Sequence, residues 1–133
     1  MAELMKLQVI CPDRIFYEGE VSMVELNTTE GEIGIYPRHI PLTSILAPGI
    51  LTITEEDRLR NAALHSGFVQ ILPEKVTVMA EAAEWPDEID LDRAEAARDR
   101  AEERIRTKDS ETDIARAETA LQRAIARINV INH

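Results

Sequence analysis

Cysteine and aromatic residues are scarce in this sequence. Its 133 residues include a single cysteine, Cys11, and only 4% of them are aromatic. One cysteine cannot form a disulfide within the chain, so the fold must depend on an apolar core, and we expect Cys11 to be buried in a strand. The length suffices for one domain with its own core plus an extension, and it is too short for two full-sized domains.

Long apolar runs are absent as well. The longest apolar stretch, residues 40–51, is interrupted by two prolines and a glycine, whereas a helix that crosses a membrane needs ~20 apolar residues. Residues 5–9 alternate apolar and polar side chains, which is typical of a strand and not of a signal peptide. We therefore expect any membrane association to be indirect, through a partner.

Positive charge is in deficit. The chain has 25 acidic and 15 basic residues, which gives a formal net charge of -10. Both the first 86 residues and the remainder are net acidic. Because a chain of this charge repels a phosphate backbone, general electrostatic binding to nucleic acid is excluded.

Motifs that carry catalysis are missing too. The sequence has neither GxxxxGKS/T nor GxGxxG, so any bound nucleotide would be held by side chains and not by a glycine-rich loop. The three histidines, His39, His65 and His133, lack the spacing of a zinc site. Ser66 lies outside any GxSxG motif and is expected in a turn, and His39 is expected to shape a loop. These features predict a non-catalytic protein.

Short runs of β-forming residues, separated by Gly, Pro and Asn, fill the first part of the chain. They are LQVIC, EVSMVELNT, GEIGIY, ILTITEE, RLRNAAL, GFVQIL and KVTVMAE. This spacing predicts an antiparallel β-sandwich with a hairpin at residues 54–60, whose polar tip is 55–57. The segment between Pro37 and Pro48 is too rich in proline for a strand in the middle of the sheet.

The periodicity changes after Trp85-Pro86. Because a residue before proline avoids the helical conformation, we expect a linker at about 83–89, followed by a helix with Asp90 as its N-cap. The pattern predicts this helix over residues 91–107.

A second helix is predicted to run to about residue 131. It follows a turn in which Ser110 can act as N-cap, so the two helices would form a hairpin. The sequence therefore predicts two parts: an N-terminal antiparallel β-sandwich, residues 1–85, and a C-terminal two-helix hairpin, residues 86–133.

The two predicted helices share a weak apolar interface. The stripe on the first helix consists of Ala94, Ala97, Ala101 and Ile105. The stripe on the second consists of Ile114, Ala117, Leu121, Ala124, Ile125, Ile128 and Ile131. Burial of a methyl group removes little area, at about 25 cal/mol per Å², so we expect a marginally stable hairpin that a competing partner can displace. An ordinary coiled-coil cap on the sandwich is the alternative.

Arginines recur on both helices. Arg93 and Arg100 lie two turns apart on the first, and Arg123 and Arg127 lie one turn apart on the second. Four guanidinium groups brought together would repel one another unless they bound an anion such as phosphate, and Asp90 could hold Arg93 or accept an amino proton from a base. The alternative is a solvated face in which the arginines pair with carboxylates. Those carboxylates are Glu95, Asp99, Glu103 and Glu118.

Two segments, together with the hairpin, resemble the epsilon subunit family of bacterial F-type ATP synthase. GEIGIYPRHIPLTSILAPG, residues 31–49, looks like one signature loop of that family, and HSGFVQI, residues 65–71, looks like the second. With the hairpin, the resemblance covers essentially the whole chain. It implies a β-sandwich followed by two helices, in a peripheral subunit at the cytoplasmic face of the bacterial cell membrane.

The resemblance also implies partners. The sandwich would bind the gamma subunit and the membrane ring of c subunits and transmit rotation between them, which couples proton flow to ATP synthesis. The helices would switch between a folded hairpin and an extended form that enters the F1 hexamer of alpha and beta subunits and inhibits ATP hydrolysis. The subunit itself would not be catalytic.

One subfamily, best known from bacilli and other thermophiles, binds ATP on the folded hairpin through an I/L-D-x-x-R-A motif. IDLDRA is similar to it at Ile89, Asp90, Arg93 and Ala94. The other positions that match this ATP-binding site are Glu84, Arg100, Arg123 and Arg127. The resemblance thus implies ATP as a regulatory ligand, makes no prediction about magnesium, and implies no catalytic or metal-binding residue.

Trp85-Pro86 and Asp92 depart from the subfamily pattern. Two alternative functions stay open. The first is a β-sandwich adaptor with a coiled-coil tail, which would need no nucleotide. Within the family, the rotor role is also compatible with a nucleotide that has no effect on inhibition. Co-purification with a large ATPase distinguishes an adaptor from a member of the family.

Overall fold

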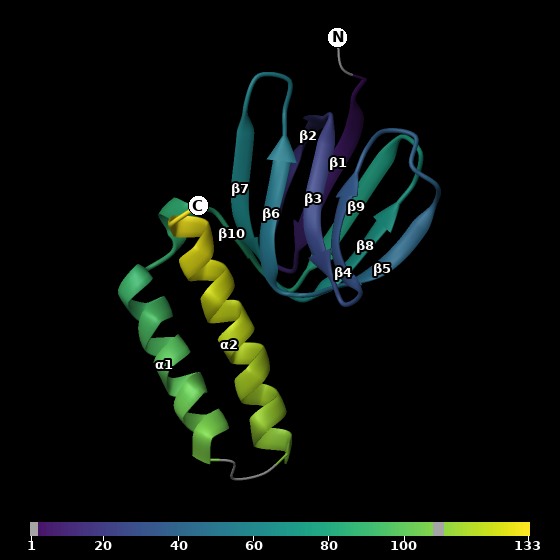
Figure 1. Ribbon diagram of the computed structural model, residues 1–133. Helices are drawn as coiled ribbons and strands as arrows, with labels where there is room; N and C mark the ends of the chain where they lie inside the picture. The colour runs from purple at the N-terminus through teal and green to yellow at the C-terminus, as the bar shows by residue number, and fades with distance from the viewer. Residues whose placement is uncertain (1–2, 108–110) are drawn as a thin grey trace.

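Ten strands and a helical hairpin make up the computed structural model, which describes residues 3–107 and 111–133 (Figure 1). The strands are β1 (Met5–Cys11), β2 (Arg14–Val21), β3 (Met23–Thr28), β4 (Gly31–Ile35), β5 (Leu42–Leu46), β6 (Gly49–Thr54), β7 (Leu59–Leu64), β8 (Gly67–Ile71), β9 (Lys75–Ala80) and β10 (Ala83–Glu84). They are followed by the short 3-10 helix η1 (Pro86–Glu88) and by α1 (Leu91–Thr107) and α2 (Glu111–Ile131).

The strands form one hydrogen-bonded path that bends over on itself. Its order is β10-β7-β6-β3-β5-β8-β9-β1-β2, and β4 pairs with β3. The bend lies where β3 meets β5, through the pair Thr28 and Leu46. Side chains from both halves of the path, such as Leu26 and Leu51 from one and Leu7 and Val78 from the other, belong to a single buried cluster. The predicted β-sandwich is therefore confirmed.

Alternation along the strands puts one face of each in this core. In β1 the side chains of Met5, Leu7, Val9 and Cys11 are buried, as expected for a strand with one face inward. The prediction that Cys11 is buried is confirmed, and burial raises the pKa of its thiol. Cys11 is thus a core residue and a poor nucleophile.

Three details of the sheet differ from the expectation. β1 and β9 pair in parallel, whereas the other strand pairs of the described residues are antiparallel. The exclusion of residues 37–48 from the middle of the sheet is wrong, because β5 lies between β3 and β8. Pro41 and Pro48 flank β5 and leave its backbone donors intact. Strand β2 was not predicted, because a bulge between Val9 and Ile10 shifts its register and interrupts its alternation.

The predicted hairpin at 54–60 and both helices are confirmed. The Glu55 amide donates to the Arg58 carbonyl at 2.8 Å between β6 and β7. Asp90 is the N-cap of α1, since its Oδ1 accepts a hydrogen bond from the Arg93 amide at 3.2 Å. The predicted cap at Ser110 lies outside the described residues. The expected linker at 83–89 instead contains β10 and η1.

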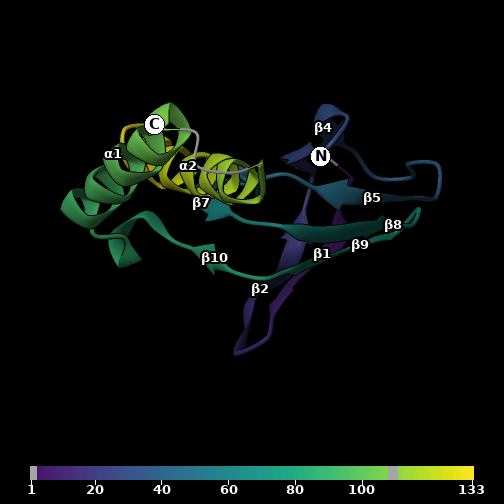
Figure 2. The same ribbon diagram turned by 90° about the horizontal axis from the view of Figure 1, so that it is seen from below.

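Helix α2 lies between α1 and the sandwich (Figures 1 and 2), and it contacts β6 and β7 as well as α1. Alanines are buried along the hairpin: Ala94, Ala101, Ala117 and Ala124. Because α2 has a second neighbour, Ala126 and Val130 are also buried, whereas Ile125, placed in the predicted stripe, is 40% exposed. No helix in the described part of the chain is long and apolar enough to span a bilayer.

Gly67, at the start of β8, is a position that only glycine fits. A Cβ atom there would overlap the Met79 carbonyl oxygen and lie 2.8 Å from Ala80 Cα, and φ is +157°. We predict that Gly67→Ala lowers the free energy of unfolding by about 2–4 kcal/mol, through steric overlap and backbone strain. Urea denaturation at pH 7 measures this change.

Gly31→Ala is the matched control. Gly31 also has a positive φ, +124°, but no atom lies within 4 Å of the place that a Cβ would take. Strain alone should therefore cost about 1 kcal/mol there. Equal losses for the two substitutions would contradict the assigned overlap with β9.

Candidate functional site

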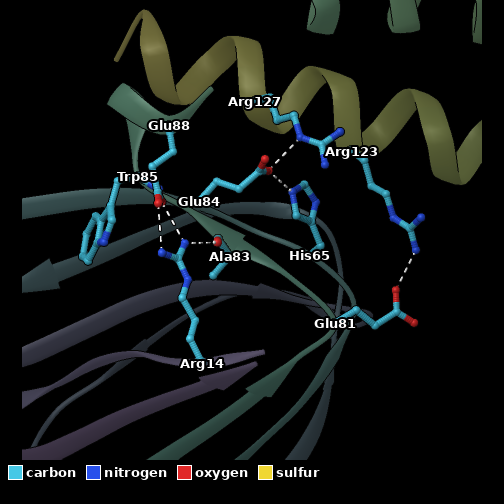
Figure 3. A network of polar contacts seen from close by, with 9 residues as sticks. All are labelled: Arg14, His65, Glu81, Ala83, Glu84, Trp85, Glu88, Arg123 and Arg127. Atoms are coloured by element: carbon cyan, nitrogen blue, oxygen red, sulfur yellow. Dashed lines mark hydrogen bonds and ion pairs between the residues drawn. The ribbon is translucent and has the colours of Figure 1, made fainter. Parts of the chain in front are cut away.

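The Glu84 carboxylate connects the sandwich to α2 (Figure 3). Its Oε1 accepts a hydrogen bond from Arg127 Nε at 2.7 Å and lies 2.9 Å from His65 Nε2. Strand β10 presents Glu84 beside β7, and His65 follows directly after β7. One oxygen thus has two nitrogen partners, one from the sandwich and one from the hairpin.

This arrangement fixes the charge of Glu84. The hydrogen bond to His65 and the contact with Arg127 outweigh partial burial and lower the pKa of Glu84 to about 2. A carboxylate is then present at neutral pH, and the imidazole nitrogen that faces it, Nε2, carries a proton. His65 Nδ1 is in turn left as an acceptor when the ring is neutral.

A second arginine of α2 lies against the same edge of the sandwich. Arg123 Nη2 donates to Glu81 Oε2 at 2.8 Å, so Arg123 and Arg127 are both paired with carboxylates of residues 81–84. Arg123 Nε and His65 Nδ1 are buried, and neither has a hydrogen-bond partner among the described residues. Buried polar atoms without partners are uncommon, which makes this edge of the sandwich a candidate for a ligand site.

Arg14 fastens the segment after β10 to the sandwich. Its Nη1 and Nη2 donate to the two oxygens of Glu88 at 2.9 and 2.8 Å, and Nη2 also donates to the Ala83 carbonyl at 3.2 Å. The same contact lowers the pKa of Glu88. A bidentate arginine and carboxylate pair of this kind has a fixed geometry.

Trp85 adds an aromatic contact to this anchor. Its ring stacks on Phe16, with centroids 4.3 Å apart, and the Arg60 guanidinium lies 4.0 Å from the Trp85 ring centroid. Residues 83–88 are therefore held at the sandwich. Ile89 and Asp90 lie between this anchored segment and α1.

The structure brings together three of the predicted site residues: Glu84, Arg123 and Arg127. The others lie nearby in sequence but have different surroundings. Ile89 is half-buried at the end of η1 and Ala94 is buried in the helix interface. Arg93 and Arg100 are exposed on α1, and within residues 3–107 and 111–133 their side chains form no ion pair. The four guanidinium groups thus do not form one cluster in this conformation.

The alternative pairing of the arginines is wrong in detail. The carboxylate partners of Arg123 and Arg127 are Glu81 and Glu84 of the sandwich. On α1 the paired arginines are instead Arg98, with Asp99 and Glu102, and Arg106, with Glu103. These α1 pairs are exposed and contribute little stability.

Two members of the network were not predicted as site residues, His65 and Glu81. His65 lacks the spacing of a zinc ligand and belongs to the HSGFVQI segment, but nothing in its sequence position indicates that it faces Glu84. It is 1% exposed, and a polar residue at the end of the apolar run AAL, residues 62–64, is the one available signal for a buried partner.

A groove lined by α2 and by residues of β3, β6 and β7 does not suit a nucleotide phosphate. Its volume is about 920 Å³, and its lining includes Asn27, Asn61, Gln122 and Asn129 but no arginine or lysine. Phosphate binding requires cations or converging backbone amides. The arginine and carboxylate edge is therefore the better candidate site.

Comparison with known families and proteins gives a consistent result. Residues 4–86 match the family model "ATP synthase, Delta/Epsilon chain, beta-sandwich domain", and residues 87–132 match "ATP synthase, Delta/Epsilon chain, long alpha-helix domain". The ATP synthase epsilon chain of Shouchella clausii is 45% identical over 129 residues, which cover 97% of this chain and 96% of the relative. That of Caldanaerobacter subterraneus subsp. tengcongensis is 43% identical over 131 residues, with 98% and 95% covered.

A solved structure has the same fold. A chain in the structure of Euglena gracilis mitochondrial ATP synthase, described as OSCP/F1/c-ring in rotational state 1, is similar with a TM-score of 0.84. The two sequences are 22% identical, and the match covers 98% of this chain and 82% of that one.

Removal of the Glu84 charge should weaken the contact between α2 and the sandwich. The pKa of Glu84 is lowered from an ordinary 4.5 to about 2, so its contribution to stability is present above about pH 4.5 and is lost as the pH falls toward 2. We predict that Glu84→Gln lowers the free energy of unfolding by about 3 kcal/mol at pH 7 and by about 1 kcal/mol at pH 3. Urea denaturation at the two pH values measures the difference.

Glu74→Gln serves as the control, because Glu74 is an exposed carboxylate away from α2. Its substitution should change stability by less than about 0.5 kcal/mol at either pH. A pH-independent effect of Glu84→Gln would mean that the charge of Glu84 does not stabilise the folded state.

Proposed function

This chain belongs to the ATP synthase delta/epsilon family, and we propose that it is the epsilon subunit of an F-type ATP synthase, a non-catalytic part of the central stalk. In this proposal its hairpin folds when ATP is bound and extends to inhibit ATP hydrolysis. The observation that carries the assignment is similarity over both parts of the chain to proteins named ATP synthase epsilon chain.

An apolar row on the outer surface of the sandwich supports binding to a rotor protein. Strand register places Ile45, Phe68, Met79, Ile10 and Ile15 side by side across β5, β8, β9, β1 and β2. Four of them are exposed, and Ile10 is half-buried. A continuous exposed apolar surface of this kind is typical of a protein interface. We assign it to the gamma subunit, and the sandwich also to the c-ring, at the cytoplasmic face of the membrane.

The anchor and the hairpin have the unequal strengths that a switch requires. Residues 83–88 are fixed by Arg14 and Trp85, whereas the helices meet mainly through alanine methyl groups. The 17 residues of α1 and 21 of α2, laid end to end at ~1.5 Å per residue, reach roughly 57 Å. An extended tail of that length can enter the hexamer of alpha and beta subunits.

ATP would stabilise the folded form through its phosphates. Arg123 and Arg127 already lie on one helix face, where their present partners are carboxylates that a triphosphate can replace. Arg93 and Arg100 are exposed on α1 and can turn toward the same ligand. A ligand that binds only the folded form stabilises it by about 1.4 kcal/mol for each tenfold excess over Kd. That gain is comparable to the weak helix interface and can decide which form predominates.

The ATP site is tested by titrating the isolated chain. We predict that Arg127→Ala weakens ATP binding at least tenfold, since a charge-assisted hydrogen bond to phosphate contributes about 1.5–3 kcal/mol. Isothermal titration calorimetry measures the affinity. Arg116→Ala, which removes an exposed arginine from the same helix, is the matched control and should leave the affinity unchanged. Equal affinity of the wild-type and Arg127→Ala chains would place the nucleotide elsewhere.

The inhibitory role is tested in the assembled enzyme. We predict that a chain without residues 88–133 still assembles through the apolar row and raises the rate of ATP hydrolysis several-fold, because the tail can no longer enter the hexamer. Phe68→Glu, in contrast, should prevent assembly by placing a charge in the row.

Leu59→Glu is the control for the assembly experiment, because Leu59 is exposed on β7, away from the row. It should assemble normally. Unchanged hydrolysis after truncation would make the hairpin a passive extension, and normal assembly of Phe68→Glu would remove the row from the interface.

A further inference from the structure

His65 contributes to the arginine and carboxylate network from inside the sandwich. It is 1% exposed, and in Figure 3 its ring points toward α2. Its Nε2 is 2.9 Å from the Glu84 oxygen that Arg127 also contacts, at 2.7 Å. Its Nδ1 is buried and has no hydrogen-bond partner in the described part of the chain.

Because one oxygen has two partners, the charge of the imidazole affects Arg127. With a neutral ring, Glu84 and Arg127 cancel each other's charge. A protonated ring provides a second cation next to the same carboxylate, which makes the three groups net positive. It competes with Arg127 for Glu84 Oε1 and repels the guanidinium.

The remaining charged groups at this interface do not cancel that change. Arg123, one turn before Arg127 on α2, is paired with Glu81 ahead of β10. In η1 the nearest carboxylate, Glu88, is occupied by Arg14. Strand β6, which pairs with β7, has no titratable side chain between Gly49 and Thr54. An added proton on His65 therefore leaves excess positive charge facing α2.

We propose that His65 is a positioning residue for the anion site, and that its protonation releases Arg127 from Glu84 and so increases the affinity of the α2 arginines for the triphosphate of ATP. This inference rests on the proposed ATP site and adds its regulation. Protonation of His65 strengthens ATP binding and favours the folded hairpin. By the same linkage, ATP binding takes up protons.

Calorimetry on the full chain tests this directly. ATP is titrated at pH 6 and pH 8, in two buffers of different ionisation enthalpy, so that affinity and proton uptake are both measured. The wild-type chain is expected to bind about tenfold more tightly at pH 6 and to take up more protons than the His65→Gln variant. Glutamine keeps an N–H donor for Glu84 and cannot be protonated. The phosphate of ATP itself titrates near pH 6, but it contributes equally to both proteins.

Each outcome is decisive. A pH profile and proton uptake that are the same in His65→Gln as in the wild type overturn the role of His65 and leave the ATP site intact. A wild-type chain that binds no ATP at either pH overturns the proposed site and this inference together, whereas binding that is lost only in Arg127→Ala supports the site.

A second measurement does not depend on a variant. Nuclear magnetic resonance of the His65 imidazole in the wild-type chain follows its protonation with and without ATP. The midpoint of that titration should move to higher pH in the presence of ATP, and an unmoved midpoint overturns the proposal. If His65→Gln fails to fold, which circular dichroism reports, this measurement decides alone.

Discussion

The ion pair between Glu84 and Arg127 is the contact on which the arrangement of this molecule depends. It joins the last strand of the sandwich to the second helix of the hairpin at 2.7 Å. Few large apolar side chains hold the hairpin in place, because the buried residues of α1 are alanines. Charged contacts therefore contribute a larger part of the docking free energy than they would in a helix pair with leucine at its centre. Charged contacts are also the kind that an anionic ligand or an acidic partner can replace.

The contacts that hold the chain to the sandwich end shortly before α1 begins. Up to Glu88, the backbone is tied to the sandwich by the bidentate contact of Arg14 and by the stacked ring of Trp85. After Asp90 it is a helix whose main neighbour is α2. A subunit with this design can stay attached to its rotor partner through the sandwich while its tail changes shape, which is the behaviour we propose for the family member described here.

Local patterns were sufficient to predict much of the fold. Proline at 86 and the cap at Asp90 locate the start of α1, and alternation identifies the inward faces of β1 and β9. Position within the sheet was not accessible in this way. β5 is central although prolines flank it, and β2 is hidden by a bulge, because strand order depends on long-range pairing that no local pattern records.

The site residues were likewise only partly predictable from local patterns. Arg123 and Arg127 were visible as a helical pair, whereas their partners Glu81 and Glu84 come from 42 and 43 residues away, and His65 was recognisable only once its surroundings were known.

The position of Trp85 has a practical consequence. It is the only tryptophan in the sequence, and it lies at the base of the hairpin, beneath a guanidinium and against a phenylalanine ring. Its ultraviolet emission therefore reports whether the base of the hairpin keeps its packing, independently of where the distal helix travels. A molecule that carries such an intrinsic optical probe allows loosening of the base to be distinguished from movement of the tail without any attached dye.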